Sequence, residues 1–276
     1  MNELHASRTV APPFVETKEY RRFAEFCDAC RQSRYIGLCH GPPGVGKTLS
    51  ARHYAQWEAL EPVFAAHGYA LDAPARPDLA GCRTIVYTPS MITTPKRLEQ
   101  EVHHLQFALH YLQEGTAHAG EDDPALALFD DRWTELVIVD EADRLKFPTL
   151  EQLRDVYDRG HFGLVLIGMP GIERRLSRYA QFYSRVGFVH QFRPLSADEL
   201  RFLLGQKWQE LGVGLDLSTF DDVEAMTAVI RITGGNFRLL QRLFAQVARI
   251  LAINGLERIS SDVVEAARES LVIGAI

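Results

Sequence analysis

The stretch of sequence that decides the fold reads GPPGVGKT and consists of Gly41, Pro42, Pro43, Gly44, Val45, Gly46, Lys47 and Thr48. It matches the pattern GxxxxGK[ST], in which glycines let a loop turn several backbone N–H groups toward phosphate oxygens. The lysine brings a positive charge to the β- and γ-phosphates, and the threonine offers a hydroxyl to Mg²⁺. The context is the required one, because a predicted strand at Tyr35–His40 precedes the loop and a predicted helix from Lys47 to about His67 follows it.

A second stretch, ELVIVDE at residues 135–141, supplies carboxylates for the same site. Its apolar residues predict a central strand, and Asp140 emerges at the carboxyl end of that strand, where open α/β sheets bind ligands. We expect Asp140 and Thr48 to hold Mg²⁺, and Glu141 to orient or deprotonate the attacking water. The two stretches together predict a site that binds ATP and Mg²⁺ and hydrolyses ATP. The expected nucleotide contacts are the loop residues, Leu49 and Asp140.

The rest of the chain falls into two parts by its hydrophobic pattern. Apolar runs at Tyr35–His40, Thr84–Thr88, Leu136–Val139 and Leu164–Ile167 alternate with helical patterns. This alternation favours an α/β fold with a parallel sheet covered by helices on both faces. After Pro194 the pattern is helical only. We therefore expect a flexible lead-in over residues 1–16, an α/β nucleotide-binding core over residues 17–194 and a small all-helical domain over residues 195–276.

Local signals place several of the expected helices. Thr94 followed by Pro95 has the sequence of a helix N-terminus, and Ser196-Ala-Asp-Glu199 has the sequence of a capping box. Gly234-Gly235 is expected to separate two helices of the C-terminal part. Residues 114–131 are rich in acidic and small residues and are expected to form an exposed insertion.

Composition and charge exclude several classes of protein. The chain has 276 residues, a net charge of −6 and no apolar run close to the ~20 residues that a membrane span needs. We expect a cytoplasmic protein with no membrane partner. The acidic balance excludes a broadly basic nucleic-acid coat. Residues 144–193 nevertheless carry nine Arg or Lys against four Asp or Glu, a local excess of 9 − 4 = +5 that either meets an anionic partner or offsets acidic surface elsewhere.

Cysteines and histidines do not form a convincing metal site. Cys27 and Cys30 make a CxxC, but neither Cys39 nor Cys82 supplies the second ligand pair that a zinc site needs. Phe23, Cys27 and Cys30 follow helical spacing, which indicates that both thiols belong to a buried face of a helix. His103 and His110, seven residues apart, are expected on one helix face that meets solvent or an interface. We expect packing for the thiols and no metal at the histidines.

These motifs resemble those of the AAA+ ATPases, over roughly residues 17–270. The resemblance implies a P-loop AAA+ core followed by a helical lid. The segment Ser184-Arg185-Val186 is similar to the one that bears the arginine finger, so Arg185 would reach the γ-phosphate of a neighbouring subunit; a surface ion pair is the alternative. The segment Gly234–Arg238 is similar to the sensor-2 segment, so Arg238 would contact nucleotide from its own chain; an ordinary helix arginine is the alternative.

One position departs from the AAA+ pattern. Relatives often place Asn, Gln, Ser or Thr after the fourth strand, where this chain has Met169. A thioether makes no useful hydrogen bond to water. The departure predicts slow hydrolysis that a partner stimulates, while leaving nucleotide binding unaffected.

The segments GPPGVGKT, VIVDEADRL, LIGMPGIERRL and YSRVGFVHQF are similar to those of bacterial DNA-transposition regulators of the TniB, TnsC and MuB type. That resemblance implies a homo-oligomer, either a ring or a filament, that loads on DNA with ATP and recruits or activates a transposase. Two alternatives remain open. One is an ATPase like helicase loaders or replication initiators, and the other is a nucleotide-gated protein adaptor that does not bind DNA.

If DNA is bound, we expect contacts to the phosphate backbone with little reading of bases. Such contacts need basic and hydroxyl side chains, preferably at a helix N-terminus. The first candidates lie after the second strand and the next ones after the third strand, and solvated surface charge is the alternative for each. The candidates are Thr93, Thr94, Lys96, Arg97, Arg144 and Lys146.

Overall fold

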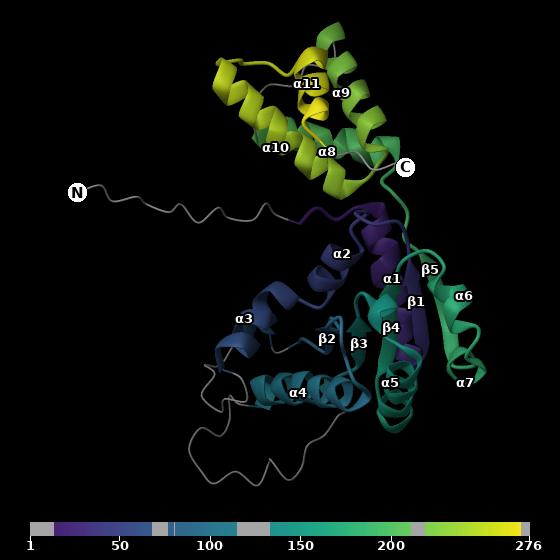
Figure 1. Ribbon diagram of the computed structural model, residues 1–276. Helices are drawn as coiled ribbons and strands as arrows, with labels where there is room; N and C mark the ends of the chain where they lie inside the picture. The colour runs from purple at the N-terminus through teal and green to yellow at the C-terminus, as the bar shows by residue number, and fades with distance from the viewer. Residues whose placement is uncertain (1–13, 68–76, 80, 115–132, 211–218, 272–276) are drawn as a thin grey trace.

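Figure 1 shows the fold as a computed structural model that describes residues 14–67, 77–79, 81–114, 133–210 and 219–271. Most of the expected lead-in over residues 1–16 and nearly all of the expected insertion over residues 114–131 lie outside the described residues. The described part divides into an α/β region and a group of four C-terminal helices, which Figure 1 shows above it.

A five-stranded sheet forms the centre of the α/β region. Its order is β2-β3-β4-β1-β5, and every neighbouring pair is parallel. The parallel sheet predicted from the alternating pattern is therefore confirmed. The strands are β1 (Ile36–His40), β2 (Thr84–Tyr87), β3 (Leu136–Val139), β4 (Gly163–Gly168) and β5 (Val186–Gln191).

The strands differ in burial: the edge strand β2 is buried along its whole length like the central strands, whereas the opposite edge strand β5 is not. β3 and β4 are buried along their whole length, as expected for central strands with helices on both faces. β5 is an edge strand that pairs only with β1, and its residues alternate between half-buried and exposed. The sequence analysis does not predict β5, because a half-exposed edge strand has no continuous apolar run.

Helix α1 (Lys18–Ser33) packs across β1, β4 and β5. Its N-cap is Thr17, whose side chain accepts a hydrogen bond from the N–H of Tyr20 at 3.1 Å. Cys27 and Cys30 are fully buried on its inner face. Burial raises the pKa of the Cys30 thiol to about 12, so the thiol stays protonated. The prediction that these cysteines serve packing is confirmed.

The helix expected from Lys47 to about His67 is in fact two helices, α2 (Lys47–Tyr54) and α3 (Trp57–His67). The chain turns at Gln56, which has a left-handed φ of 51°. Trp57 and Leu60, which follow the turn, are buried in the core. The break thus accompanies the packing of Trp57 and Leu60 into the core, a tertiary effect that helical spacing does not reveal.

Helix α4 (Pro95–Glu114) contacts strand β2 and helix α5 (Phe147–Arg159). Thr94 caps α4 as expected, because its hydroxyl accepts from the N–H of Arg97 at 3.3 Å. The expectation for the histidines is wrong in part. His103 is exposed, but His110 is buried and lies 5.6 Å from Trp133 between ring centroids.

Short helical turns complete the α/β region. They lie next to β2, after β3 and between β4 and β5, and the last two of them precede the segment that contains Arg185. They are η1 (Pro77–Leu79), η4 (Ala142–Arg144), α6 (Ile172–Leu176) and α7 (Ala180–Tyr183).

The C-terminal helices build a second hydrophobic core. The first core runs from Phe23 to Phe192 and the second from Leu195 to Ala267. Ser196 and Glu199 exchange hydrogen bonds as in a capping box, at 3.0 Å and 3.3 Å. The helices are α8 (Ala197–Glu210), α9 (Phe220–Thr233), α10 (Phe237–Asn254) and α11 (Ser261–Glu269).

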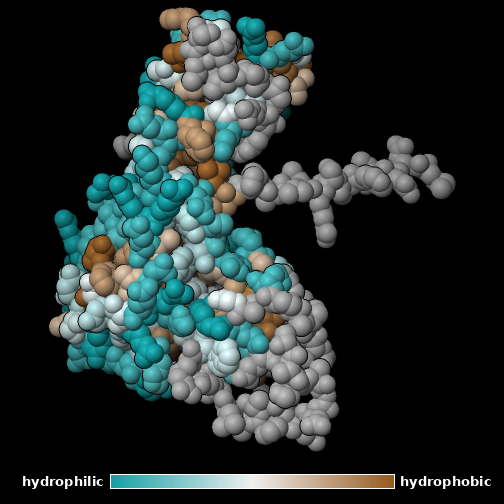
Figure 2. Space-filling model, turned by 180° about the vertical axis from the view of Figure 1, so that it is seen from behind, coloured by the Kyte–Doolittle hydropathy of each residue, from teal (hydrophilic) through white to brown (hydrophobic). Residues whose placement is uncertain are grey.

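Seen from behind in Figure 2, the described surface is mostly hydrophilic, with hydrophobic residues in small patches. Scattered patches of this kind are usual for a globular protein. Across the described residues, none of the helices combines the length and the hydrophobicity needed to cross a bilayer.

Candidate nucleotide-binding site

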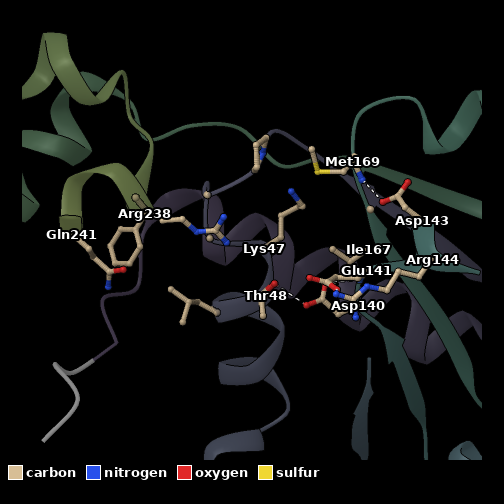
Figure 3. A pocket seen from close by; sticks show the side chains of 16 residues that line it. Lys47, Thr48, Asp140, Glu141, Asp143, Arg144, Ile167, Met169, Arg238 and Gln241 are labelled. Atoms are coloured by element: carbon tan, nitrogen blue, oxygen red, sulfur yellow. Dashed lines mark hydrogen bonds and ion pairs between the residues drawn. The ribbon is translucent and has the colours of Figure 1, made fainter. Parts of the chain in front are cut away.

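A cavity of about 620 Å³ lies at the carboxyl edge of the sheet, where β1, β3 and β4 end. Figure 3 shows side chains from several separate parts of the chain around it. They come from the GPPGVGKT loop and the start of α2, from the segments after β3 and β4, and from the start of α10. The lining residues are Pro43, Gly44, Gly46, Lys47, Thr48, Leu49, Asp140, Glu141, Asp143, Arg144, Ile167, Gly168, Met169, Phe237, Arg238 and Gln241.

The phosphate-binding loop depends on glycine at two positions. Gly44 and Gly46 have φ values of 79° and 109°, which side chains rarely adopt. A Cβ on Gly44 would also lie 2.5 Å from Asn236 Oδ1. Helix α2 begins directly after Gly46, so its unsatisfied N–H groups and positive dipole end face the loop. This arrangement favours an anionic ligand.

Lys47 lies inside the loop that precedes it. Its Nζ donates to the carbonyl oxygens of Gly41 at 2.6 Å and Pro42 at 2.8 Å. An ammonium has three N–H donors, so one is left for a phosphate oxygen. Partial burial lowers the pKa of Lys47, while the negative charge of Asp140 acts in the opposite direction. The loop therefore fixes the position of one cation at the floor of the cavity.

Thr48 and Asp140 meet at the carboxyl edge of the sheet although 92 positions separate them in sequence. The Thr48 hydroxyl donates to Asp140 Oδ2 at 2.7 Å, and the N–H of Glu141 donates to Asp140 Oδ1 at 2.8 Å. Asp140 is only 4% exposed. A hydroxyl and a carboxylate beside a phosphate-binding loop are oxygen ligands of the type that Mg²⁺ prefers. The two residues fit the metal that the sequence predicts.

Glu141 follows Asp140 and adopts a left-handed φ of 51°. A non-glycine residue held in this region costs free energy, and such residues gather at functional sites. Its carboxylate forms an ion pair with Arg144, as Figure 3 shows. Glu141 therefore lines the cavity as expected, but it has a cationic partner that the sequence analysis does not foresee.

Asp143 is a cavity residue that the sequence analysis misses. Its Oδ2 accepts a hydrogen bond from the N–H of Met169 at 2.7 Å. A Cβ at Gly168 would lie 2.7 Å from the same oxygen, so this approach requires glycine there. Met169 lines the cavity with a 41% exposed side chain. The sequence feature that could have identified Asp143 is its place as the third carboxylate in the run DEAD at residues 140–143.

The start of α10 is bonded directly to the phosphate-binding loop. The N–H of Arg238 donates to the Gly44 carbonyl at 3.0 Å, and Asn236 Nδ2 donates to the Pro43 carbonyl at 2.9 Å. The structure therefore brings Arg238 to the cavity, where the sequence predicts it. Asn236 was missed as a contact, because only its helix-capping role is visible in the sequence.

A second cavity of about 310 Å³ adjoins the first, and both are lined by Gly46, Leu49, Phe237 and Gln241. Its wall is mainly apolar and includes Phe14, which stacks on His53 with ring centroids 3.8 Å apart. A flat heteroaromatic ring fits an apolar cavity of this size next to a phosphate site. The sequence analysis does not find it, because its residues come from four distant parts of the chain: the N-terminal segment, the stretch from the phosphate-binding loop to the start of α3, the stretch from Phe192 into α8, and the start of α10.

Arg185 lies away from the cavity of its own chain. Its Nε and Nη2 bond the two carboxylate oxygens of Asp158 at 2.5 Å and 2.7 Å. Such a fork is a strong and directional ion pair. Asp158 also binds Arg154 at 2.6 Å. The pairing agrees with the alternative of a surface ion pair, and it leaves a role toward a second subunit as a proposal.

The candidate DNA contacts lie on two neighbouring segments at the same edge of the sheet. Lys96 and Lys146 are exposed, whereas Arg97 pairs with Glu101 at 2.8 Å. Thr93 and Thr94 stand at the start of α4, where Thr94 caps the helix. Arg144 donates from Nη1 to the Pro89 carbonyl at 2.8 Å, which joins the two segments.

Comparison with known proteins places the chain among ATPases. A family model described as an AAA domain matches residues 30–176. A potential ATP-binding protein of Staphylococcus aureus is 48% identical over 270 residues, which are 95% of this chain and 97% of that protein. The DNA transposition protein B of the Mu-like prophage FluMu from Haemophilus influenzae is 23% identical over 85% of this chain and 72% of its own length. The ATP-dependent target DNA activator B of Escherichia phage Mu is 25% identical over 83% of this chain and 66% of its own length.

Solved structures agree on the fold. The RuvB Holliday junction branch migration motor of Thermotoga maritima superposes with a TM-score of 0.56 at 16% identity, over 93% of this chain and 70% of that chain. The ORC2 protein of Aeropyrum pernix superposes with a TM-score of 0.56 at 18% identity, over 97% of this chain and 72% of that chain. The family match, the loop built around Lys47 and the sheet order lead to one conclusion: the chain belongs to the AAA-domain family of P-loop ATPases, with a distant similarity to the Mu-type transposition activators.

Proposed function

We propose that the protein binds Mg²⁺ and ATP, hydrolyses ATP slowly, and assembles with ATP on DNA as a regulator of transposition that recruits or activates a transposase. The observation that carries the nucleotide part is the 2.7 Å contact between Thr48 and Asp140 beside Lys47. The transposition part is supported by the similarity to the transposition protein B and the target DNA activator B.

In the proposed reaction, Lys47 and the loop N–H groups bind the phosphates, and Thr48 and Asp140 hold Mg²⁺. Glu141 accepts a proton from water while the water oxygen bonds to the γ-phosphorus and the bond to ADP breaks. Met169 offers no hydrogen bond to orient that water. The adjoining apolar cavity beside Leu49 is proposed to take the base of the nucleotide.

We further propose that the core over residues 17–194 and the lid over residues 195–276 move together through the bonds of Asn236 and Arg238 to the loop. Arg185 would leave Asp158 and bind the γ-phosphate of a neighbouring subunit. An arginine supplied in this way is worth about 10³–10⁵ in rate in well-studied phosphoryl-transfer enzymes. Homo-oligomerisation, as a ring or a filament, would then depend on ATP.

DNA contact is proposed at Thr93, Thr94, Lys96, Arg97, Arg144 and Lys146. The segment after β2 and the segment after β3 lie together, and the N-terminus of α4 adds N–H groups for a phosphate. Contacts of this type position a protein on DNA without selecting a sequence.

One observation favours a second function, a nucleotide-gated adaptor for protein partners. Of the candidate DNA contacts, Arg97 pairs with Glu101 and Arg144 with Glu141, so part of the positive charge is already neutralised. The net charge of −6 also favours the adaptor, because an acidic protein is repelled by the phosphates of DNA.

A mobility-shift experiment separates the two functions. Duplexes of unrelated sequence are titrated with protein in ATP, in ADP and without nucleotide. Binding that needs ATP and is similar for all sequences supports the transposition regulator. Undetectable binding in every nucleotide state, at low salt, would favour the adaptor and overturn the DNA part of the proposal.

A further inference from the structure

The polar face of helix α10 carries positive charge only. Its sequence, FRLLQRLFAQVARILAIN, contains Arg238, Arg242 and Arg249 and no acidic residue. All three arginines are exposed. In the part of the chain that the structure describes, no carboxylate forms an ion pair with any of their guanidinium groups. The three positive charges of this helix are therefore uncompensated.

Other arginines of the C-terminal helices have acidic partners. Arg231 of α9 and Arg268 of α11 both pair with Glu265, and Arg201 of α8 pairs with Asp198 at 2.8 Å. The whole chain has a net charge of −6, so acidic side chains outnumber basic ones. Uncompensated arginines on a single helix of such a protein indicate a surface for an anionic ligand.

The arginines of α10 form a straight row. With 3.6 residues per turn, positions 238, 242 and 249 fall within about 40° of one another around the helix and span about 16 Å along its axis. Ala245 and Ala252 are exposed on the same face, so a ligand can approach the helix closely between the longer side chains. The opposite face is buried in the second hydrophobic core, which holds the row in place.

The length and the charge of the row fit the backbone of a DNA duplex. One strand carries a negative charge about every 3.4 Å along the axis, so a row of this length meets several phosphates. The α/β region of a second copy is a poorer partner. Among the carboxylates of residues 14–194 whose side chains are described, all but Glu25 already have a partner.

We propose that this face of α10 is a second DNA-binding surface, on which Arg242 and Arg249 bind backbone phosphates. The proposal rests on the DNA-binding function proposed above, and it adds contacts that lie apart from the start of α4. A guanidinium fork matches a pair of phosphate oxygens. Arg238, at the cavity end of the row, is left for the nucleotide (Figure 3). Contacts of this kind do not select a DNA sequence.

The same helix is bonded to the phosphate-binding loop. The N–H of Arg238 donates to the Gly44 carbonyl at 3.0 Å, and Asn236 binds the Pro43 carbonyl at 2.9 Å. Any shift of the loop on nucleotide binding therefore acts on the helix that holds the arginine row. If ATP strengthens DNA binding through α10, DNA must strengthen ATP binding by the same factor.

Fluorescence anisotropy with a labelled duplex, in ATP and Mg²⁺ at several salt concentrations, tests the surface. The double variant Arg242→Gln, Arg249→Gln is compared with Arg231→Gln, Arg268→Gln. This control removes the same two charges from exposed arginines of the C-terminal helices that already have a partner. Each phosphate contact contributes about 0.9 to the slope of log K against log salt. The slope should become shallower by about 1.8 in the first variant and stay unchanged in the control.

A conservative variant separates the charge from the fold. Arg242→Lys, Arg249→Lys keeps both positive charges and should keep the slope, because an ammonium also binds phosphate. Thermal melting checks that each variant is folded. A folded Arg242→Gln, Arg249→Gln protein with the slope of the wild type would overturn the proposal. An equal change of slope in the control would also overturn it, since net charge alone would then explain the effect.

Failure of this surface can be told apart from failure of the DNA-binding function. A wild type that binds no duplex in ATP contradicts both. A wild type whose slope responds to Lys96→Ala but not to Arg242→Gln, Arg249→Gln leaves the function standing and removes α10 from the contact. If the glutamine variant binds DNA normally but no longer assembles with ATP in sedimentation velocity, the row contacts a second copy of the chain and the proposal is wrong.

Discussion

Asn236 Nδ2 donates a 2.9 Å hydrogen bond to the carbonyl of Pro43, a residue 193 positions earlier in the chain. The same side chain caps α10, because its Oδ1 accepts from the N–H of Leu239 at 3.1 Å. The side-chain amide of Asn236 thus caps a helix of the C-terminal part and also forms a hydrogen bond with the phosphate-binding loop. Any movement of α10 relative to the loop must change this contact.

The two roles of Asn236 can be separated by substitution. Asn236→Ala should lower the free energy of unfolding by about 1 kcal/mol through the lost cap and should also weaken ATP binding. Asn236→Ser should keep the cap but not reach Pro43, so stability returns while ATP binding stays weak. Thermal melting and nucleotide titration measure the two effects.

Ser260→Ala is the matched control, because Ser260 caps α11 in the same way, at 3.3 Å to the N–H of Val263, without touching the loop. It should lose stability and keep ATP affinity. Equal ATP affinity in the wild type, Asn236→Ala and Asn236→Ser would show that the contact with Pro43 does not serve the nucleotide.

Met169 leads to a prediction about rate. Its backbone N–H bond to Asp143 does not depend on its side chain, so Met169→Asn should keep the local structure and add a hydrogen-bonding group to the cavity wall. We expect kcat to rise about fivefold, the equivalent of one hydrogen bond of about 1 kcal/mol. Rapid hydrolysis by the wild type alone, measured as phosphate release, would show that another group already orients the water.

Much of the fold and of the site follows from local sequence. The loop around Lys47, the strand that ends at Asp140 and the capping box at Ser196 are each encoded within a few residues, and each was predicted. The parts that were missed depend on distant contacts. β5 is recognisable only beside β1, and the turn at Gln56 only through the burial of Trp57.

The same distinction holds within the site. Asn236 reaches the loop through a hydrogen bond across 193 positions of sequence, and no spacing rule gives such a contact. Arg238 was predicted at the cavity only through the resemblance to AAA+ ATPases. The apolar cavity beside Leu49 collects residues from four segments. The pairing of Glu141 with Arg144 is local, but it became visible only when the turn η4 showed where the two side chains point.

Arg185 should act across a subunit boundary. Arg185→Ala should bind ATP nearly normally, because Arg185 does not line its own cavity, but should assemble and hydrolyse poorly. In mixtures with Lys47→Ala, that variant can donate Arg185 to the intact site of Arg185→Ala. Partial recovery of hydrolysis is the expected result.

Arg154→Ala is a useful control for this experiment, since Arg154 binds the same Asp158 carboxylate. It should assemble like the wild type. If mixtures of Arg185→Ala and Lys47→Ala co-assemble but remain as inactive as each protein alone, Arg185 does not act in trans.

DNA binding should weaken steeply as salt increases, because phosphate contacts release counterions. Lys96→Ala should lower the affinity for all sequences alike and reduce the slope of log K against log salt by about 1. Lys18→Ala, a lysine at the start of α1, should leave the slope unchanged. Affinities measured by fluorescence anisotropy at several salt concentrations give the slopes, and a slope that Lys96→Ala does not alter would remove Lys96 from the contact.

The most direct measurement follows the lifetime of the protein on DNA when hydrolysis is blocked. Glu141→Gln is loaded on duplex DNA with ATP and Mg²⁺, challenged with excess competitor DNA, and compared with the wild type and with Lys47→Ala. Glu141→Gln should dissociate much more slowly than the wild type, and Lys47→Ala should fail to load because it cannot bind nucleotide. Equal dissociation of Glu141→Gln and the wild type, or loading of Lys47→Ala as efficient as that of the wild type, would contradict ATP-controlled assembly on DNA.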